Sequence, residues 1–135
     1  MLKLIIGVKG TGKTKTLISM VNEAVATSKG SVICIEKGDK LRYDVKYQAR
    51  LIDTNEYFVD DAQSLFGFVA GILASNHDVT DLFIDSALKI CQNDAAAFDK
   101  FLDEMNTLVE KLNVNVVITS SIPVEDASET VKKFV

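Results

Sequence analysis

The segment from Gly7 to Thr14 (Gly-Val-Lys-Gly-Thr-Gly-Lys-Thr) constrains the fold of this chain more than any other part of the sequence. It matches the pattern G-x-x-x-x-G-K-[ST] at every fixed position and lies between an apolar run and an amphipathic segment. Glycine permits positive φ angles and a close approach of the backbone to a ligand. Successive N–H groups at the start of a helix then form a nest for anions. The segment therefore predicts a strand–loop–helix unit that binds phosphate groups.

The rest of the chain alternates between strand-like and helix-like patterns. Short runs of apolar, β-compatible residues predict strands over residues 2–6, 31–36, 50–53, 81–85 and 114–119. Apolar residues at helical spacing predict helices over residues 13–28, 60–74 and 94–112. Such alternation is typical of a parallel sheet with helices on both faces. We therefore expect an α/β fold, a three-layer α/β/α sandwich with a mainly parallel five-stranded sheet.

The length of 135 residues fits one domain, and we expect residues 1–135 to form a single nucleotide-binding unit. The pattern does not give the order of the strands across the sheet. Residues 125–134, beyond the only proline, form either a short helix or a loosely docked segment.

The charge of the chain argues against nucleic acid as its main partner. The net charge is −4, whereas domains that bind nucleic acid usually carry a basic field. One local exception is the segment from Lys37 to Arg50, where five Lys and Arg stand against two Asp. We interpret it as a solvated loop or hairpin in preference to a binding patch.

Membrane and secretory signals are weak in this sequence. No segment has the roughly 18–20 apolar residues that span a bilayer, and the N-terminal apolar run is too short for a signal peptide. Cys34 and Cys91 are far apart and form no CxxC pattern, which indicates buried free thiols in a reducing compartment. These features predict a cytoplasmic protein.

The candidate ligand is a nucleoside triphosphate, ATP or another NTP, with Mg²⁺. Lys13 would reach the β- and γ-phosphates, and the hydroxyl of Thr14 would bind Mg²⁺. Asp85 ends the apolar run Leu82-Phe83-Ile84, so its carboxylate is the expected second magnesium ligand; the alternative is that it only caps the next turn. The expected binding residues are Gly7, Val8, Lys9, Gly10, Thr11, Gly12, Lys13, Thr14 and Lys15, with Lys9 and Lys15 in secondary, largely solvated positions.

At these residues the sequence resembles the P-loop NTPase superfamily over about residues 1–120. Residues 7–14 are similar to its Walker A motif and residues 82–85 to its Walker B motif. The order of the elements resembles the RecA-like branch, in which another strand separates the Walker A and Walker B strands. This resemblance implies a sensor-like role for Thr119 or Ser120 at the end of the last strand, where an ordinary strand-end hydroxyl is the alternative.

The sequence departs from that branch directly after Asp85. Members that hydrolyse ATP usually carry a glutamate there, to orient water, but the next residue in this chain is Ser86. We therefore expect slow turnover or a base from elsewhere, with Glu36 as the candidate by position and Asp53 as a weaker one. No arginine finger is assigned; Arg42 and Arg50, the only arginines, lie in the charged connector and could act on a neighbouring subunit.

These residues leave three functions open. The first is an ATP-binding protein or a weak, partner-activated ATPase that acts as a switch or in an assembly. It would work either as a homo-oligomer or with a partner protein, and a role like that of a motor ATPase rests on analogy alone. The second is a small nucleotide or nucleoside kinase, with residues 37–47 as a hairpin like that of thymidine kinases; the presence of just two arginines and the lack of an obvious lid insertion argue against it. The third is a nucleotide-binding module without hydrolysis, which the intact Lys13 and Thr14 argue against.

Overall fold

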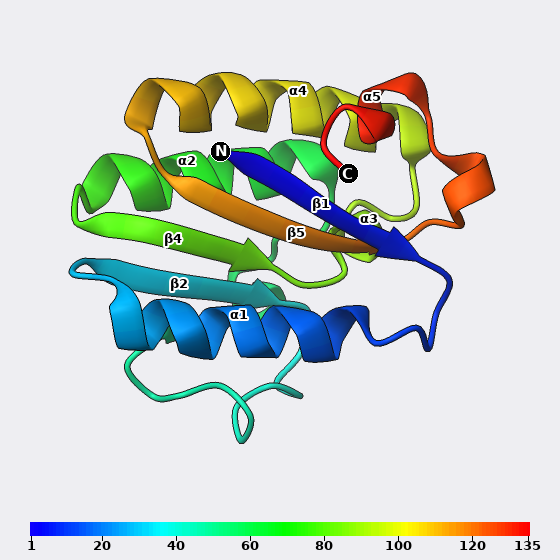
Figure 1. Cartoon of the computed structure of the whole chain (residues 1–135). Helices are drawn as coiled ribbons and strands as arrows, with labels where there is room; N and C mark the ends of the chain where they lie inside the picture. The colour runs from blue at the N-terminus through cyan, green and yellow to red at the C-terminus, as the bar shows by residue number, and fades with distance from the viewer.

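The computed structural model describes all residues from Met1 to Val135, and its centre is a sheet of five parallel strands. The strands are β1 (Leu2–Gly7), β2 (Ser31–Glu36), β3 (Arg50–Asp53), β4 (Val79–Ile84) and β5 (Asn115–Ser121). Every pairing between neighbours is parallel, so all five strands end at one edge of the sheet, on the right in Figure 1. This confirms the expected five-stranded α/β fold.

The order of the strands across the sheet is β1-β5-β4-β2-β3. The last strand in sequence, β5, therefore lies between β1 and β4. Its Ile118 is paired with Leu4 of β1 on one side and with Ile84 of β4 on the other. Residues 116–118 of β5 are buried on both faces of the sheet, as expected for a central parallel strand.

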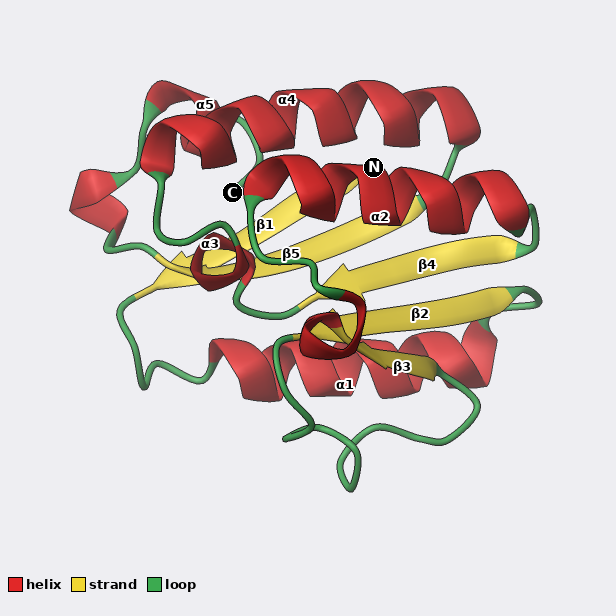
Figure 2. Ribbon diagram, turned by 180° about the vertical axis from the view of Figure 1, so that it is seen from behind, coloured by secondary structure: helices red, strands yellow, loops and turns green.

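Helices cover both faces of the sheet, which confirms the three-layer arrangement. One face carries α2 (Ala62–Ser75), α4 (Ala95–Leu112) and the short α5 (Glu129–Lys132), and the other carries α1 (Lys13–Thr27) (Figures 1 and 2). Three further short turns are η1 (Thr54–Tyr57), α3 (Ala87–Ile90) and η2 (Val124–Asp126). None of the helices combines the length and the apolar character that crossing a membrane requires.

The two faces of the sheet belong to two separate hydrophobic clusters. The larger cluster holds 25 buried residues and joins the sheet to α2 and α4 through side chains such as Leu65, Phe101 and Leu102. The smaller cluster holds nine buried residues, with Leu17 and Val21 of α1 among them. It is completed by Leu41, Val45 and Ala49, which come from the loop of residues 37–49 between β2 and β3. This loop contains no helix and packs beside α1 on the same face.

Side-chain caps fix the starts of the helices on the larger face. Asp61 accepts a hydrogen bond from Ser64 N (2.7 Å), and the Ser64 hydroxyl accepts one from Asp61 N (3.1 Å), which makes a capping box at the start of α2. Asp94 accepts from Ala97 N (3.1 Å) at the start of α4. These caps agree with the helix starts expected from the sequence.

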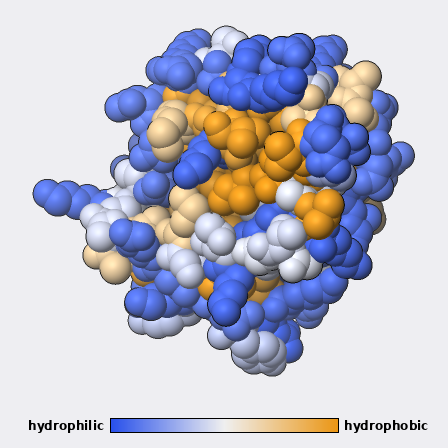
Figure 3. All heavy atoms as spheres, turned by 45° about the vertical axis from the view of Figure 1, so that its right-hand side comes forward, coloured by the Kyte–Doolittle hydropathy of each residue, from blue (hydrophilic) through white to orange (hydrophobic).

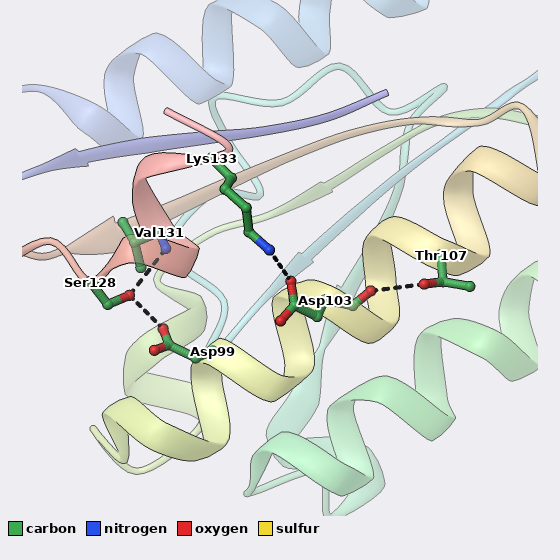
Figure 4. A network of polar contacts seen from close by, with 6 residues as sticks. All are labelled: Asp99, Asp103, Thr107, Ser128, Val131 and Lys133. Atoms are coloured by element: carbon green, nitrogen blue, oxygen red, sulfur yellow. Dashed lines mark hydrogen bonds and ion pairs between the residues drawn. The ribbon is translucent and has the colours of Figure 1, made fainter.

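The tail after Pro123 is a short helix that docks on α4 (Figure 4). The Ser128 hydroxyl donates to Asp99 Oδ1 (2.8 Å) and accepts from Val131 N (3.1 Å), and Lys133 Nζ forms an ion pair with Asp103 (2.7 Å). The backbone carbonyl of Phe134 also accepts a hydrogen bond from Leu4 N of β1 (2.7 Å). Of the two alternatives for this tail, the structure therefore has the short helix.

Candidate functional site

The glycine loop links the end of β1 to the start of α1. Gly12, the residue before α1, has a φ of 86°, and no side chain caps the helix. The first N–H groups of α1 are therefore open to an anion, which the helix dipole also favours. Gly7 has a φ of 152°, and a Cβ at this position would lie 2.8 Å from Thr11 Oγ1. The loop thus needs glycine at both ends of its turn.

The loop is closed on itself by its own lysine. Lys13 Nζ donates a hydrogen bond to the carbonyl oxygen of Val8 (2.8 Å), and Thr11 Oγ1 donates to the same oxygen (2.7 Å). Lys13 forms no ion pair with a carboxylate. Its ammonium group is therefore held beside the open N–H groups, where it adds a positive charge to the anion nest.

A second group of polar residues lies where α1, β4 and β5 meet. Thr14 Oγ1 donates to the carboxylate of Asp85, at 3.1 Å from Oδ1 and 3.2 Å from Oδ2. Thr119 Oγ1 donates to Asp85 Oδ1 (2.7 Å) and accepts from Ser86 N (2.8 Å). Asp85 and Thr119 are both buried. The carboxylate is thus held between two threonine hydroxyls, one of which directly follows the glycine loop.

The donors in this group suit Mg²⁺ better than a transition metal. A hydroxyl and a carboxylate are hard oxygen ligands, which Mg²⁺ prefers, and this ion usually keeps waters and phosphate oxygens as its other ligands. No cluster of three or more His, Cys, Asp or Glu side chains is present that could hold a metal alone. Thr14 and Asp85 therefore fit a magnesium ion that arrives together with phosphate groups.

The two candidate sensor residues point in different directions. Thr119 lines the cavity beside Asp85. Ser120 is fully buried, donates to Thr119 O (2.8 Å) and accepts from Leu88 N (3.3 Å), and it does not line the cavity. Side chains alternate along a strand, so Ser121 follows Thr119 on the cavity side.

Glu36, at the end of β2, also lines the cavity and is buried. Its Oε1 accepts from Lys40 N and its Oε2 from Leu41 N, both at 3.1 Å. Burial raises the pKa of the Glu36 carboxyl above its usual value; these two N–H donors oppose the shift, and the charges of Asp85 and Asp53 add to it. Asp53, the weaker candidate base, accepts from Gly38 N and Asn55 N (2.8 and 2.9 Å) and does not line the cavity.

These residues surround one cavity of about 640 Å³ at the carboxyl ends of the strands. Ligands of parallel α/β sheets commonly bind at this edge. Six lysines line the cavity and none of them forms an ion pair: Lys9, Lys13, Lys15, Lys37, Lys40 and Lys89. They face only two carboxylates, those of Glu36 and Asp85, so the cavity favours a multiply charged anion.

Several lining residues were absent from the sequence-based prediction. Lys37 and Lys40 follow β2, and Lys89 and Asn93 follow β4. The signal that could have found them is their position, because the residues after the carboxyl ends of parallel strands meet at one edge. The sequence contains no motif that marks them.

A second, smaller cavity of about 230 Å³ adjoins the first and shares Leu88 and Ser121 with it. It lies between α4, η2 and α5, and its apolar lining includes Phe98, Ile122 and Val131. Figure 3 brings this edge of the sheet forward and shows hydrophobic atoms in the middle of the face, surrounded by hydrophilic ones. A polar cavity and an apolar one thus lie next to each other.

Comparisons with known proteins give information on the fold. No protein-family model matches the sequence, and no curated protein is significantly similar to it. Among solved structures with a similar fold is the KaiC-like protein PH0186 from the hyperthermophilic archaeon Pyrococcus horikoshii, with a TM-score of 0.72 and 16% sequence identity. The match covers 98% of this chain but only 66% of the other. At this identity the likeness shows the fold alone, and it agrees with the expected P-loop NTPase fold of RecA-like type, with β5 between β1 and β4.

Proposed function

We propose that this chain binds a nucleoside triphosphate, ATP or a close relative, together with Mg²⁺, and that it hydrolyses the nucleotide slowly unless a partner accelerates the reaction. The observation that carries this proposal is the contact between Thr14 Oγ1 and the Asp85 carboxylate at the mouth of the glycine loop. A hard-oxygen pair beside an open anion nest and inside one cavity is what a magnesium–triphosphate requires.

The roles of the residues follow from their positions. The N–H groups of the loop and of the first turn of α1 would bind the phosphates. Lys13 would release the carbonyl oxygen of Val8 and donate to phosphate oxygens instead, because these are charged and therefore stronger acceptors. Thr14 and Asp85 would hold the magnesium ion, which when bound neutralises charge on the β- and γ-phosphates. Thr119 would keep the Asp85 carboxylate in position.

Slow turnover follows from the surroundings of the candidate base. Ser86, the residue after Asp85, carries no carboxylate, so Glu36 is the group we propose to orient the attacking water. Each of its oxygens already accepts one backbone N–H, which leaves a second lone pair on each oxygen for water. A carboxylate held by two backbone hydrogen bonds can orient water, but it cannot easily move toward the water during the reaction. We therefore expect hydrolysis to be slow without a partner.

The surplus of lysines favours one alternative, phosphoryl transfer to an anionic acceptor. Lys37 and Lys40 line the cavity from the end of β2, which is separated from β1 by two strands. A phosphorylated acceptor bound there would face the γ-phosphate. Release of inorganic phosphate without any added acceptor would rule out this alternative.

Isothermal titration with ATP, ADP and GTP, each with and without Mg²⁺, tests nucleotide binding. We expect Lys13→Ala to weaken ATP binding by about 10- to 100-fold, because a hydrogen bond to a charged group contributes about 1.5–3 kcal/mol. Lys100→Ala is the matched control, since Lys100 is exposed on α4 and outside the cavity. Wild-type protein that binds none of the nucleotides at millimolar concentration would refute the proposal.

The magnesium site has its own test. In Asp85→Asn the side chain keeps its shape but loses the charge that attracts the ion, so Mg²⁺ should no longer strengthen ATP binding. Binding measured without Mg²⁺ should change much less. An unchanged effect of Mg²⁺ in this variant would mean that Asp85 is only a cap of the turn after β4.

A further inference from the structure

The charges of the chain divide between its two parts. Residues 1–50 contain ten Lys and Arg against four Asp and Glu, and residues 51–135 contain five against fifteen. Residues 1–50 form β1, α1, β2, the 37–49 loop and the first residue of β3. Five of their ten cations line the cavity described above, and Arg42, Lys46 and Arg50 lie in the segment of residues 37–50 outside that cavity. A strong charge asymmetry of this kind suggests a polyanionic partner for the basic part, whatever the net charge of the whole chain.

The 37–49 loop holds two large aromatic side chains in solvent. Leu41, Val45 and Ala49, spaced four residues apart, are buried against α1 and the sheet. Tyr43 and Tyr47 lie between them and are 83% and 91% exposed. The two tyrosines therefore point away from the core because their neighbours point into it.

Hydrogen bonds hold this loop in place. Asn22 of α1 donates from Nδ2 to Asp44 O and accepts at Oδ1 from Lys46 N, both at 2.9 Å. Glu36 accepts from the backbone N–H groups of Lys40 and Leu41, as described above. The rings of Tyr43 and Tyr47 thus sit on a fixed support, which lowers the entropy cost of binding to them.

Cations surround the two rings. The guanidinium of Arg42 lies over the ring of Tyr43, 4.8 Å from its centroid, and donates to its hydroxyl (2.8 Å). Two other cations of the segment, Lys46 and Arg50, are exposed outside the cavity, whereas Lys37 and Lys40 are exposed at its lining. The only ion pair in the segment joins Arg42 to Asp39 at 3.9 Å, with both side chains largely exposed. These positive charges are therefore available to a ligand.

We propose that the outer surface of residues 37–50 binds single-stranded nucleic acid. Sequence-tolerant binding of single strands combines cations that contact the phosphates with aromatic rings on which unpaired bases stack. The segment offers both, and an exposed ring held out from a fixed loop suits a free base better than a base inside a duplex. An acidic protein would also contact both the cations and the tyrosines, and competition by polyglutamate separates that partner from nucleic acid. The proposal goes beyond nucleotide binding and does not depend on it.

Fluorescence anisotropy tests this proposal on the whole chain without added nucleotide. The probe is a labelled oligothymidine of about 20 nucleotides, longer than the roughly 4–16 nucleotides of a single-domain site. We expect binding at low salt that weakens as KCl rises, with a slope near −0.7 for each phosphate contacted. We also expect tighter binding of this probe than of a duplex of the same length. No binding at low salt, equal binding of the duplex, or equal competition by polyglutamate would overturn the proposal.

Two pairs of substitutions separate the contributions of stacking and charge. Tyr43→Ala with Tyr47→Ala should weaken binding at least tenfold, since one stacked base contributes about 1–3 kcal/mol, and should leave the salt slope unchanged. Arg42→Gln with Lys46→Gln should reduce the salt slope by one or two contacts. Lys100→Gln with Lys111→Gln, on the exposed side of α4, removes the same charge elsewhere and should change neither quantity. The proposal would be overturned if the control pair weakened binding as much as the tyrosine pair, or if the tyrosine pair did not weaken binding at all. Thermal unfolding confirms that each variant is folded.

Discussion

The two faces of the central sheet differ in what covers them. On one face, α2 and α4 enclose the cluster of 25 buried residues, and residues 51–135, which supply these helices, carry a surplus of ten negative charges. On the other, α1 and the 37–49 loop cover a cluster of nine buried residues, and residues 1–50 carry a surplus of six positive charges. Both faces share the same five strands, so the difference comes from the connections.

This difference separates the larger hydrophobic core from much of the proposed ligand sites. Hydrophobic stabilisation grows with the apolar area that is buried, and most of it lies under α2 and α4. The glycine loop, Glu36 and the exposed tyrosines all belong to the other face or to its edge. We expect this face, with a small core and a loop in place of a helix, to have the lower local stability.

The largest expected effect compares one leucine from each cluster. Leu102 of α4 and Leu41 of the loop are both buried. Leu102→Ala should lower the free energy of unfolding by about 3–5 kcal/mol, because the rigid packing of two helices on the sheet cannot close the cavity. Leu41→Ala should cost about 2 kcal/mol, since a loop can move to fill the space. Urea unfolding measures both, and equal losses would contradict the contrast between the two faces.

A smaller effect tests whether the loop is held or only resting on the sheet. Asn22→Ala removes both hydrogen bonds between α1 and the loop, which should cost about 1–2 kcal/mol. It should also speed cleavage by trypsin after Lys46, because local opening becomes easier. Asn106→Ala in α4 is the matched control, since that side chain makes no hydrogen bond with the rest of the chain. Unchanged cleavage would mean that the three buried loop residues alone hold the segment.

The contrast between the faces also explains what the sequence could and could not predict. The glycine loop, the ends of α1, α2 and α4, and Asp85 were predicted because each depends on residues close together in the chain. Thr14 and Asp85 were expected to meet because a magnesium site beside the glycine loop needs both a hydroxyl and a carboxylate. These features need only local patterns and the rule that parallel strands end together.

The features that were missed depend on packing between distant segments. The 37–49 loop is predicted to be solvated, yet its Leu41, Val45 and Ala49 are buried. Their four-residue spacing is that of one helix face, although the segment forms no helix. Which of Thr119 and Ser120 faces the cavity depends on the register of β5 between two strands, because a shift of one residue would exchange their orientations. The hydrogen bonds that Glu36 accepts from Lys40 N and Leu41 N require a turn directly after β2, and no sequence motif predicts this turn.

The smallest expected change concerns the pH dependence that Glu36 gives to stability. Its pKa in the folded chain is above the ordinary value of 4.5, chiefly through burial, with the charges of Asp85 and Asp53 adding to the shift. As pH rises above 4.5, unfolding therefore releases a proton, so the unfolded state binds fewer protons and the free energy of unfolding falls. The fall ends once pH exceeds the pKa of the folded chain, and it is absent below 4.5.

Glu36→Gln removes this titration. The free energy of unfolding of wild type minus that of Glu36→Gln should therefore decrease from pH 4.5 upward and then become constant. Glu36→Gln should also be less stable than wild type at every pH, because the amide offers one acceptor oxygen to two N–H donors. Urea unfolding at a series of pH values measures this. Asn22→Ala, which is also destabilised but keeps Glu36, should follow the pH slope of the wild type. If the difference in free energy of unfolding between wild type and Glu36→Gln does not change with pH, the pKa of Glu36 is not raised by folding. The face that carries α1 would then hold a buried carboxylate whose ionisation does not lower stability as pH rises.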